Sequence, residues 1–219
     1  MRAISYNVKK LLKETPSDIT IVAAIKGRTV EEVQEAIESG IKYIGENYLQ
    51  ETEKKYPFIG KVVRWHFIGH IQKRKSKKIV ELFDMVETLD SIEVAEEINQ
   101  EASKIDKIMP VLIEVNSGRE QQKSGLTTEN VESFIEQISH FKNIKVQGIM
   151  TMGPFFEDAE KLRPYFIETR KLFEDIKKKN IQNVEMEFLS MGMSSSYKVA
   201  IEEGANIIRI GTLIFGPRS

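Results

Sequence analysis

The chain contains the apolar, β-rich stretch Thr20-Ile-Val-Ala-Ala-Ile-Lys26 near its start and the stretch Asn206-Ile-Ile-Arg-Ile-Gly-Thr-Leu-Ile-Phe-Gly216 near its end. If they form the first and last strands of a closed parallel barrel, the two stretches are neighbours. Lys26, Arg209 and the Gly211-Thr212 turn then meet at the C-terminal ends of the strands. Parallel α/β folds bind their ligands at that end.

Short apolar runs alternate with longer charged segments of helical period along the chain, which is the pattern of repeated βα units. We predict eight strands, at Thr20 to Ile25, Tyr43 to Gly45, Arg64 to Ile68, Met85 to Leu89, Met109 to Val115, Lys145 to Met150, Glu185 to Leu189 and Ile207 to Ile210. This pattern predicts one α/β domain over residues 1–219, a single (β/α)8 TIM-type barrel. An open doubly wound sheet is the alternative.

Residues typical of helix ends support these boundaries. Gly40 and Gly204 each follow a predicted helix, where a left-handed residue ends it, and Ser91 and Ser194 stand at expected N-caps. The first residues, up to about Leu12, predict an extra amphipathic N-terminal helix in front of the first strand.

Composition limits the classes of protein. Charged residues make up 30% of the chain but leave a net charge of -1, so nothing global attracts nucleic acid or an anionic membrane. The absence of cysteine excludes a disulfide framework and thiolate chemistry. The N-terminus has no apolar core of a secretory signal, and no stretch approaches the ~20 apolar residues of a membrane span. We expect a soluble cytoplasmic protein without nucleic-acid or membrane partners.

Two loops near the end of the chain predict an anion site. Ser190-Met-Gly-Met-Ser-Ser-Ser196 leads from a strand into a helix expected at Tyr197 to Glu203, so its N–H groups and hydroxyls can converge on an anion. Gly192 permits close backbone approach, and Gly211-Thr212 offers donors on the adjacent strand end. These features favour a phosphate site over the alternative, an ordinary capped helix with a glycine turn.

Lys26 and Arg209 are the candidate reactive groups. A lysine at a strand end is usually solvated or salt-bridged, but five apolar or small residues precede Lys26. Desolvation and a nearby Arg209 are expected to lower the pKa of the amine toward the neutral form that Schiff-base chemistry needs. Arg209 lies within an apolar run, where an unpaired guanidinium is costly, so it needs a ring nitrogen, a carboxylate or a phosphate as partner.

Other motifs give weaker signals. His66 and His70 have the i, i+4 spacing of metal ligands on a helix, but they fall on a strand and a loop, so we predict no metal site. Lys73-Arg-Lys-Ser-Lys-Lys78 is interpreted as the solvated face of an amphipathic helix, with contact to nucleic acid, phosphate or a partner as alternatives. No Gly-x-Ser-x-Gly elbow, Walker loop or dinucleotide fingerprint supports a hydrolase or a nucleotide-binding protein.

Seven motifs follow one another over almost the whole chain: Ala23-Ala-Ile-Lys26, Gly45-Glu-Asn-Tyr-Leu-Gln-Glu51, Trp65-His-Phe-Ile-Gly-His-Ile-Gln72, Val115-Asn-Ser-Gly118 with Lys123-Ser-Gly125, Gly148-Ile-Met-Thr-Met152, Leu189-Ser-Met-Gly-Met-Ser194 and Arg209-Ile-Gly-Thr-Leu-Ile-Phe-Gly216. At these residues the sequence resembles the pyridoxal phosphate homeostasis proteins, a family of barrels that bind pyridoxal 5'-phosphate (PLP) and are similar to the N-terminal domain of alanine racemase.

The resemblance implies that PLP is the cofactor, held as a covalent aldimine to Lys26. Arg209 then faces the pyridine nitrogen, and Asn47 lies near the ring. The phosphate is held by Ser190, Gly192, Met193, Ser194, Gly211 and Thr212.

The chain departs from the family pattern at two places. The family usually has Ser-Lys-Thr around the aldimine lysine, whereas Ile25 and Gly27 flank Lys26. It usually has an acid two residues after the Met-Ser pair, where this chain has Ser196. The first change alters the hydrogen bonds available beside the cofactor, and the second keeps a residue type that caps helices.

By this resemblance we expect a PLP carrier in vitamin B6 homeostasis, with no catalytic residue. An arginine at the ring nitrogen disfavours a protonated ring, because two cations would face each other, and this weakens PLP as an electron sink. Racemases of the similar fold add a second domain with a tyrosine acid/base, whereas this chain stops at Ser219. We expect a monomer that serves PLP-dependent apo-enzymes.

Two alternative functions remain. The first is a weak PLP-dependent amino-acid racemase, which Tyr48, Tyr197 or His66 could assist. The second is a PLP-independent interaction module that uses the basic segment 73–78.

Overall fold

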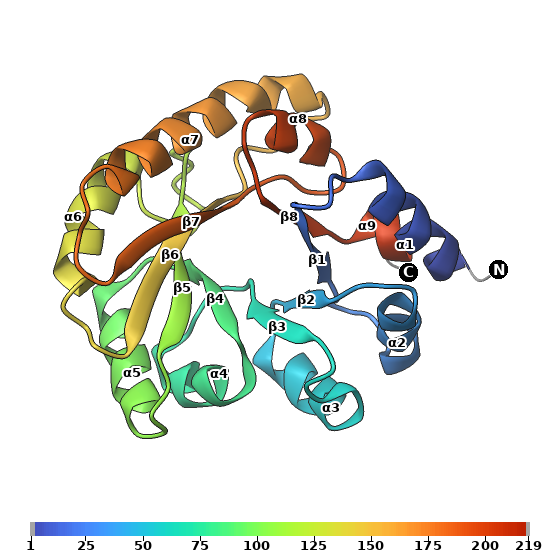
Figure 1. The fold of residues 1–219 in the computed structure, drawn as a ribbon, viewed down its shortest axis with the longest axis horizontal. Coiled ribbons are helices and arrows are strands. Elements are labelled where there is room, and N and C mark those ends of the chain that lie inside the picture. Colours follow the sequence, from blue (N-terminus) through green and yellow to red (C-terminus); the bar gives the residue numbers. More distant parts are fainter. Residues whose placement is uncertain (1–2, 218–219) are drawn as a thin grey trace.

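The computed structural model describes residues 3–217, in which eight parallel strands close into a barrel in chain order (Figure 1). The strands are β1 (Thr20–Ala24), β2 (Tyr43–Glu46), β3 (Arg64–Phe67), β4 (Met85–Leu89), β5 (Met109–Val115), β6 (Ile144–Thr151), β7 (Val184–Ser190) and β8 (Ile207–Ile210). Each strand lies where the sequence predicted one, with ends that differ by at most one residue. The TIM-type barrel is therefore confirmed.

The barrel closes between β1 and β8. These strands pair in parallel, with Ile21 opposite Ile208 and Val22 opposite Arg209, and the N–H of Thr20 donates to the carbonyl of Asn206 at 2.8 Å. β1 also pairs with β2, and β8 with β7, so neither strand is an edge. The alternative of an open doubly wound sheet, which would leave two edges, is therefore wrong.

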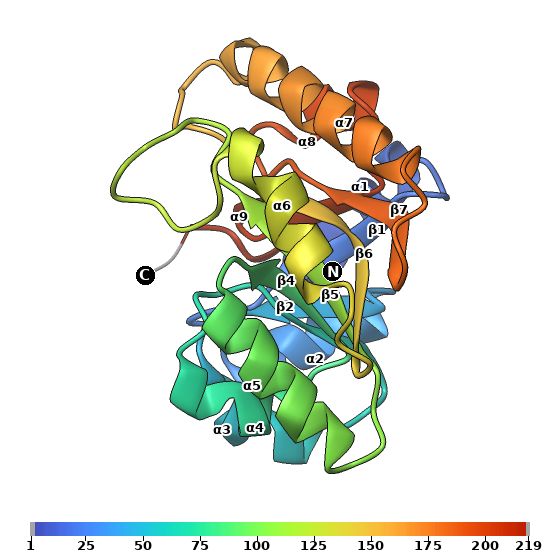
Figure 2. The same ribbon diagram turned by 90° about the vertical axis from the view of Figure 1, so that its left-hand side faces the viewer.

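Helices cover the outside of the strands, and α5, α6 and α7 lie side by side over β5, β6 and β7 (Figure 2). The α-helices are α1 (Ala3–Glu14), α2 (Val30–Glu38), α3 (Leu49–Ile59), α4 (Ser76–Leu82), α5 (Ile92–Ser103), α6 (Thr128–Ile138), α7 (Arg163–Lys177), α8 (Tyr197–Glu202) and α9 (Thr212–Phe215). Two 3-10 turns, η1 (Lys73–Lys75) and η2 (Ala159–Leu162), precede α4 and α7. The extra N-terminal helix is confirmed as α1, and its Asn7 amide donates to the Ile214 carbonyl of α9 at 3.0 Å.

Local side-chain bonds explain several helix ends. Thr29 caps α2 in a capping box, since its hydroxyl accepts from the N–H of Glu32 while the Glu32 carboxylate accepts from the N–H of Thr29. Ser91 caps α5 as predicted. The prediction that Ser194 caps the next helix is wrong, because α8 begins after Ser196 and the Ser194 hydroxyl binds elsewhere.

The strands of the barrel bury both an apolar cluster and several polar side chains. The apolar cluster consists of Val22, Met85, Leu112, Met150 and Ile207. Two residues further along their strands, Glu87 and Arg209 point to the same side as Met85 and Ile207, because side chains alternate along a strand. Glu87 and Arg209 therefore lie nearer the C-terminal ends of their strands, and the side chains of His66 and Ser190 are buried with them.

The single tryptophan, Trp65, is a residue of β3, and its side chain packs against α3 and the end of α4. Its side chain is only 1% exposed, and its indole N–H donates to the Gly60 carbonyl at 2.8 Å. The rings of Tyr56 and Phe83 lie 5.4 Å and 6.2 Å from it, centroid to centroid. This aromatic cluster joins α3 and the end of α4 to the strand.

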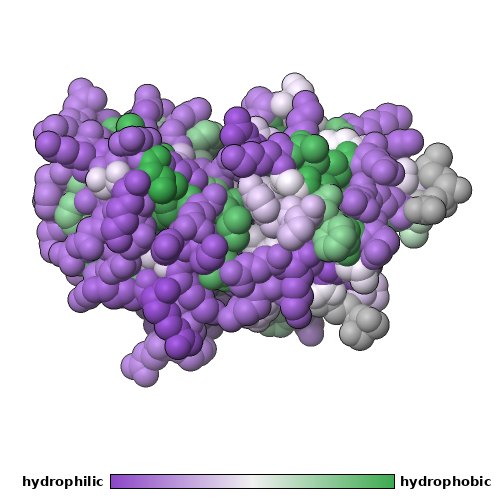
Figure 3. All heavy atoms as spheres, turned by 90° about the horizontal axis from the view of Figure 1, so that it is seen from below, coloured by the Kyte–Doolittle hydropathy of each residue, from purple (hydrophilic) through white to green (hydrophobic). Residues whose placement is uncertain are grey.

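Figure 3 shows the molecule from below the orientation of Figure 1. On the face seen in Figure 3, hydrophilic residues predominate and hydrophobic residues form small, separate patches. Within residues 3–217, no helix combines the length and the apolar character needed to cross a membrane.

Gly148 in β6 is a position where packing forbids a side chain. Its φ is +152°, and a Cβ there would lie 1.8 Å from the Phe188 carbonyl oxygen of the neighbouring strand. Gly148→Ala is expected to lower the free energy of unfolding by about 2 kcal/mol or more, as overpacking does, which urea unfolding measures. As a control, Gly211→Ala adds only ordinary contacts of 3.7 Å or more. Equal stability of the two variants would contradict this account.

Candidate functional site

A cavity of about 420 Å³ opens at the C-terminal ends of the strands. Seven of the nine predicted site residues line it: Lys26, Asn47, Met193, Ser194, Arg209, Gly211 and Thr212. The volume lies in the range of ~300–1,000 Å³ that is typical of small-molecule sites. The closed barrel therefore brings the amine, the guanidinium and the two final loops to one cavity.

Several large apolar side chains also line the cavity, and the sequence analysis missed most of them. They are Ile68, Met152, Phe155 and Met193. Phe155 is 85% exposed, so this apolar lining reaches the surface. Met152 directly follows β6, where a strand-end search finds it, whereas no pattern marks Phe155 in its loop. The remaining lining residues are Ala24, Arg28 and Ser195.

Lys26 stands in a tight turn after β1. The N–H of Ile25 donates to the Gly45 carbonyl at 2.9 Å, and the N–H of Arg28 closes the turn on the Ile25 carbonyl at 3.0 Å. Gly27 has φ +69°, a conformation that glycine adopts without strain. The half-buried side chain of Lys26 lines the cavity.

Ser194 joins the loops that follow β7 and β8. Its hydroxyl oxygen accepts hydrogen bonds from the N–H groups of Gly211 and Leu213, both at 3.3 Å. Ser195 and Thr212 line the cavity beside it, which adds two more hydroxyls. Backbone donors and hydroxyls thus gather on one side of the cavity, as in anion-binding sites.

Two of the predicted phosphate ligands, Gly192 and Ser190, do not line this cavity. Gly192 has φ +90°, and a Cβ on it would lie 2.5 Å from the Cβ of Ala200 in α8. Its carbonyl accepts from the N–H of Arg209 at 3.0 Å. Gly192 therefore permits the loop to pack against α8 and β8, and it does not face the cavity.

Arg209 is buried, with 5% of its surface exposed, and its guanidinium is held by protein groups. One nitrogen donates to the Ser190 hydroxyl at 2.6 Å, and another donates to the Thr151 carbonyl at 2.9 Å. The same guanidinium lies 3.8 Å from the Glu87 carboxylate. Burial lowers the pKa of Arg209, and Glu87 and Glu114 oppose this shift. Of the three partners that the sequence left open, the structure supplies a carboxylate.

Glu87 connects Arg209 to His66 through the interior of the barrel. One carboxylate oxygen lies 2.6 Å from His66 Nδ1, and the other accepts from the Ser190 hydroxyl at 2.6 Å. Burial raises the pKa of Glu87, but the interactions with His66, Arg209 and Ser190 outweigh it and keep the pKa below its usual value. Sequence reasoning missed Glu87, although an acid inside the apolar run Met85–Leu89 is the same signal that marked Arg209.

The structure separates the two histidines that were weighed as metal ligands. His66 points into the barrel, whereas His70 lies near the surface, 3.4 Å from the Ser124 hydroxyl. Over residues 3–217, no group of three or more His, Cys, Asp or Glu side chains could hold a metal ion. In the basic segment 73–78, Lys78 pairs with Glu81 at 2.9 Å. The predicted amphipathic pattern is confirmed there, because Ile79 and Val80 are buried.

Asn47 offers the cavity an unused acceptor. Its amide nitrogen donates to the Ile68 carbonyl at 3.2 Å, while its buried Oδ1 has no hydrogen-bond partner among the described residues. A buried acceptor without a partner is costly. A ligand that donates a hydrogen bond to Oδ1 removes this cost, so Asn47 fits a polar ring substituent.

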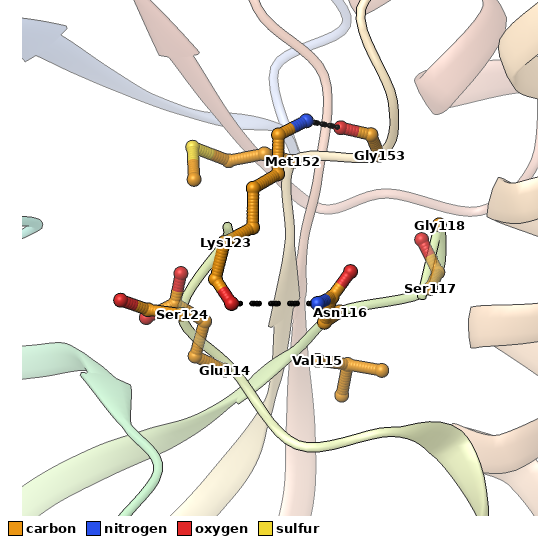
Figure 4. A pocket seen from close by; sticks show the side chains of 9 residues that line it. All are labelled: Glu114, Val115, Asn116, Ser117, Gly118, Lys123, Ser124, Met152 and Gly153. Atoms are coloured by element: carbon orange, nitrogen blue, oxygen red, sulfur yellow. Dashed lines mark hydrogen bonds between the residues drawn. The ribbon is translucent and has the colours of Figure 1, made fainter. Parts of the chain in front are cut away.

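A second, much smaller cavity lies beside the first, at the ends of β5 and β6 (Figure 4). Met152 borders both cavities. The volume is about 10 Å³, which is room for about one water molecule. Lys123 crosses this cavity and donates to the Gly153 carbonyl at 2.9 Å (Figure 4). Glu114 lines it as well, and burial next to Asp90 raises the pKa of Glu114 to about 7.

The raised pKa of Glu114 predicts a pH-dependent stability. The folded protein keeps a proton that the unfolded chain loses between pH 4.5 and about 7, so the contribution of Glu114 to stability falls as the pH rises through this range. Glu114→Gln lacks this titration. Between about pH 5 and about pH 8 its free energy of unfolding is therefore expected to fall by about 2 kcal/mol less than that of the parent. Urea unfolding at both pH values measures this. The exposed Glu96→Gln is the control, and equal pH profiles for the parent and Glu114→Gln would contradict the prediction.

The chain is similar in sequence to curated proteins. The pyridoxal phosphate homeostasis protein of Aquifex aeolicus is 41% identical over 199 residues, which cover 90% of this chain and 86% of that protein. The protein of the same name from Vibrio alginolyticus is 36% identical over 220 residues, covering 98% and 93%.

Among solved structures, PipY of Synechococcus elongatus PCC7942 is 26% identical and covers 97% of this chain and 100% of its own. The TM-score is 0.91 for PipY without PLP and 0.89 for PipY with PLP bound. A family model described as "Alanine racemase, N-terminal domain" matches residues 1–219. The chain therefore belongs to the alanine racemase N-terminal domain family and, within it, to the pyridoxal phosphate homeostasis proteins.

Proposed function

We propose that this chain binds PLP as a Schiff base with Lys26 and takes part in PLP homeostasis as a carrier. The proposal rests on the observation that the same cavity is lined by Lys26, Arg209, Ser194 and Thr212. The solved PipY structure with PLP bound supports the choice of ligand. When bound, PLP supplies an aldehyde that condenses reversibly with a primary amine.

Most of the predicted contacts have a group in the cavity that could make them. Lys26 supplies the amine, and the hydroxyls of Ser194 and Thr212 with the backbone of Gly211 would hold the phosphate. Asn47 Oδ1 would accept a hydrogen bond from the ring. Ser190, predicted as a phosphate ligand, would act through Arg209, whose guanidinium it orients.

Arg209 favours a carrier over an enzyme. We place its guanidinium at the pyridine nitrogen, where its positive charge opposes protonation of the ring and so limits carbanion chemistry. The bonds to Ser190 and Thr151 hold the guanidinium in one orientation, which supports this placement. Because Glu87 lies 3.8 Å away, the buried charge is balanced without a phosphate.

The three residues that could assist a racemase do not line the cavity. Tyr48 is 56% exposed, Tyr197 is buried, and His66 is bonded to Glu87 inside the barrel. Within the described residues, no lining side chain is a second acid/base opposite Lys26. We therefore propose that this chain is not an enzyme. As a carrier, we propose, it acts as a monomer in the cytoplasm and delivers PLP to apo-enzymes.

Lys26→Ala is expected to abolish the absorbance of the PLP Schiff base near the edge of the visible range and to leave the fold intact. The side chain is only half-buried, so the free energy of unfolding should change by less than about 0.5 kcal/mol. Absorption spectra before and after borohydride, with peptide mapping of the reduced lysine, measure the loss. The exposed Lys54→Ala serves as control. Unchanged absorbance in Lys26→Ala would place the attachment at another lysine.

A carrier should not exchange the Cα proton of amino acids. Incubation of the PLP-loaded protein with Cα-deuterated amino acids is expected to give no exchange above that of free PLP, since the cavity has no opposing acid/base. Mass spectrometry of the recovered amino acids measures this. Robust exchange that disappears in Lys26→Ala would establish the racemase alternative.

A further inference from the structure

A buried ionic cluster lies beneath the turn that carries Lys26. Its centre is the ammonium group of Lys55 on α3. This residue is only 5% exposed. Lys55 Nζ donates to Glu46 Oε2 and to Glu51 Oε2, both at 2.7 Å, and to the carbonyl of Ile25 at 3.0 Å. An ammonium has three protons to donate, so these bonds use all of them.

The cluster holds the backbone on both sides of Lys26. Ile25, the residue before it, accepts from Lys55, and the N–H of Gly27, the residue after it, donates to Glu51 Oε2 at 2.7 Å. The same carboxylate oxygen of Glu51 therefore binds Lys55 and Gly27. These bonds fix the direction in which the Lys26 side chain leaves the turn.

A second arm of the cluster reaches the loop after β2. Glu46 is fully buried, and its Oε1 accepts from the N–H of Asn47 at 2.8 Å and from that of Tyr48 at 3.3 Å. Through Lys55, the turn with Lys26 and the loop with Asn47 are thus bonded to one charged group. Both residues line the large cavity.

Stability alone does not require such a cluster. Buried ion pairs are often replaceable by apolar side chains without loss of stability, whereas they fix one geometry. The pKa values of the two carboxylates shift in opposite directions. Burial raises the pKa of Glu46, whereas the bonds from Lys55 and Gly27 to Glu51 outweigh burial and lower the pKa of Glu51. The side chain of Glu51 is the more exposed of the two, so a conservative substitution there should disturb the fold less.

We propose that Lys55, bound between Glu46 and Glu51, is a positioning residue that holds Lys26 and Asn47 in the geometry for capturing the aldehyde of PLP. This inference rests on the proposed function. Lys55 itself does not line the cavity, so it acts through the backbone of Ile25 and, by way of Glu51, of Gly27.

The test compares two ligands that share the phosphate and the ring. PLP has an aldehyde, whereas pyridoxine 5'-phosphate has an alcohol and cannot react with Lys26. Lys55→Met in the full chain is expected to weaken PLP binding about tenfold or more, the effect of losing a hydrogen bond to a charged group. Binding of pyridoxine 5'-phosphate should weaken clearly less than binding of PLP, because it loses only the ring contact to Asn47 while the phosphate side of the cavity is intact.

Hydrogen exchange of the protein without ligand gives an independent readout. The amide of Gly27 is expected to exchange about tenfold faster in Lys55→Met, because its acceptor Glu51 loses its own anchor. Glu51→Gln should weaken PLP binding and speed the exchange of Gly27, as Lys55→Met does. It replaces Lys55→Met in the test if that variant does not fold. The matched control is Lys54→Met, which changes the exposed lysine next to Lys55. Its PLP binding and its exchange at Gly27 should equal those of the parent.

Each outcome decides a different point. Equal weakening of both ligands with unchanged exchange at Gly27 would show that Lys55 only stabilises the fold, and would overturn the inference. A parent protein that binds both ligands equally, without a borohydride-stable adduct at Lys26, would overturn the proposed function instead. The exchange of Gly27 would still decide whether Lys55 positions this turn.

Discussion

The pairing of β1 with β8 is the constraint on which the site depends. It places Val22 opposite Arg209, and it brings Lys26 and the Gly211-Thr212 turn to the same end of the barrel, although more than 180 residues separate them along the chain. A one-residue slip would turn Arg209 out of the barrel, away from Ser190 and Glu87. Closure and register therefore determine together which groups face the cavity.

The site is built on charges that the fold buries and satisfies. Arg209 has Glu87, Ser190 and the Thr151 carbonyl, and Lys55 has two carboxylates and a backbone carbonyl. Such groups are costly if one partner is removed, so each network tolerates one arrangement. Two separate networks thus support the cavity: one beneath the guanidinium of Arg209 and one beneath the turn of Lys26.

The sequence predicted the barrel well, because apolar periodicity and strand length determine strand positions locally. It also predicted that Lys26, Ser194, Arg209 and Thr212 lie at the same end of the barrel, because the C-terminal ends of parallel strands share one edge. It did not reveal that Ser190 and Gly192 do not line the cavity, because the position of Gly192 depends on contacts with α8 and β8 and that of Ser190 on its bonds to Glu87 and Arg209. Lys55 looked like an ordinary charged residue of α3, and only tertiary structure shows what its ammonium binds.

The burial of Trp65 gives this protein an intrinsic fluorescent reporter. The chain has no other tryptophan, and the indole is held rigidly by Gly60 and by the rings of Tyr56 and Phe83. Its emission therefore originates in one dry environment and shifts to longer wavelength when solvent reaches β3. Since Tyr56 directly follows Lys55 on α3, the spectrum monitors the helix that supports the turn of Lys26, without any added label.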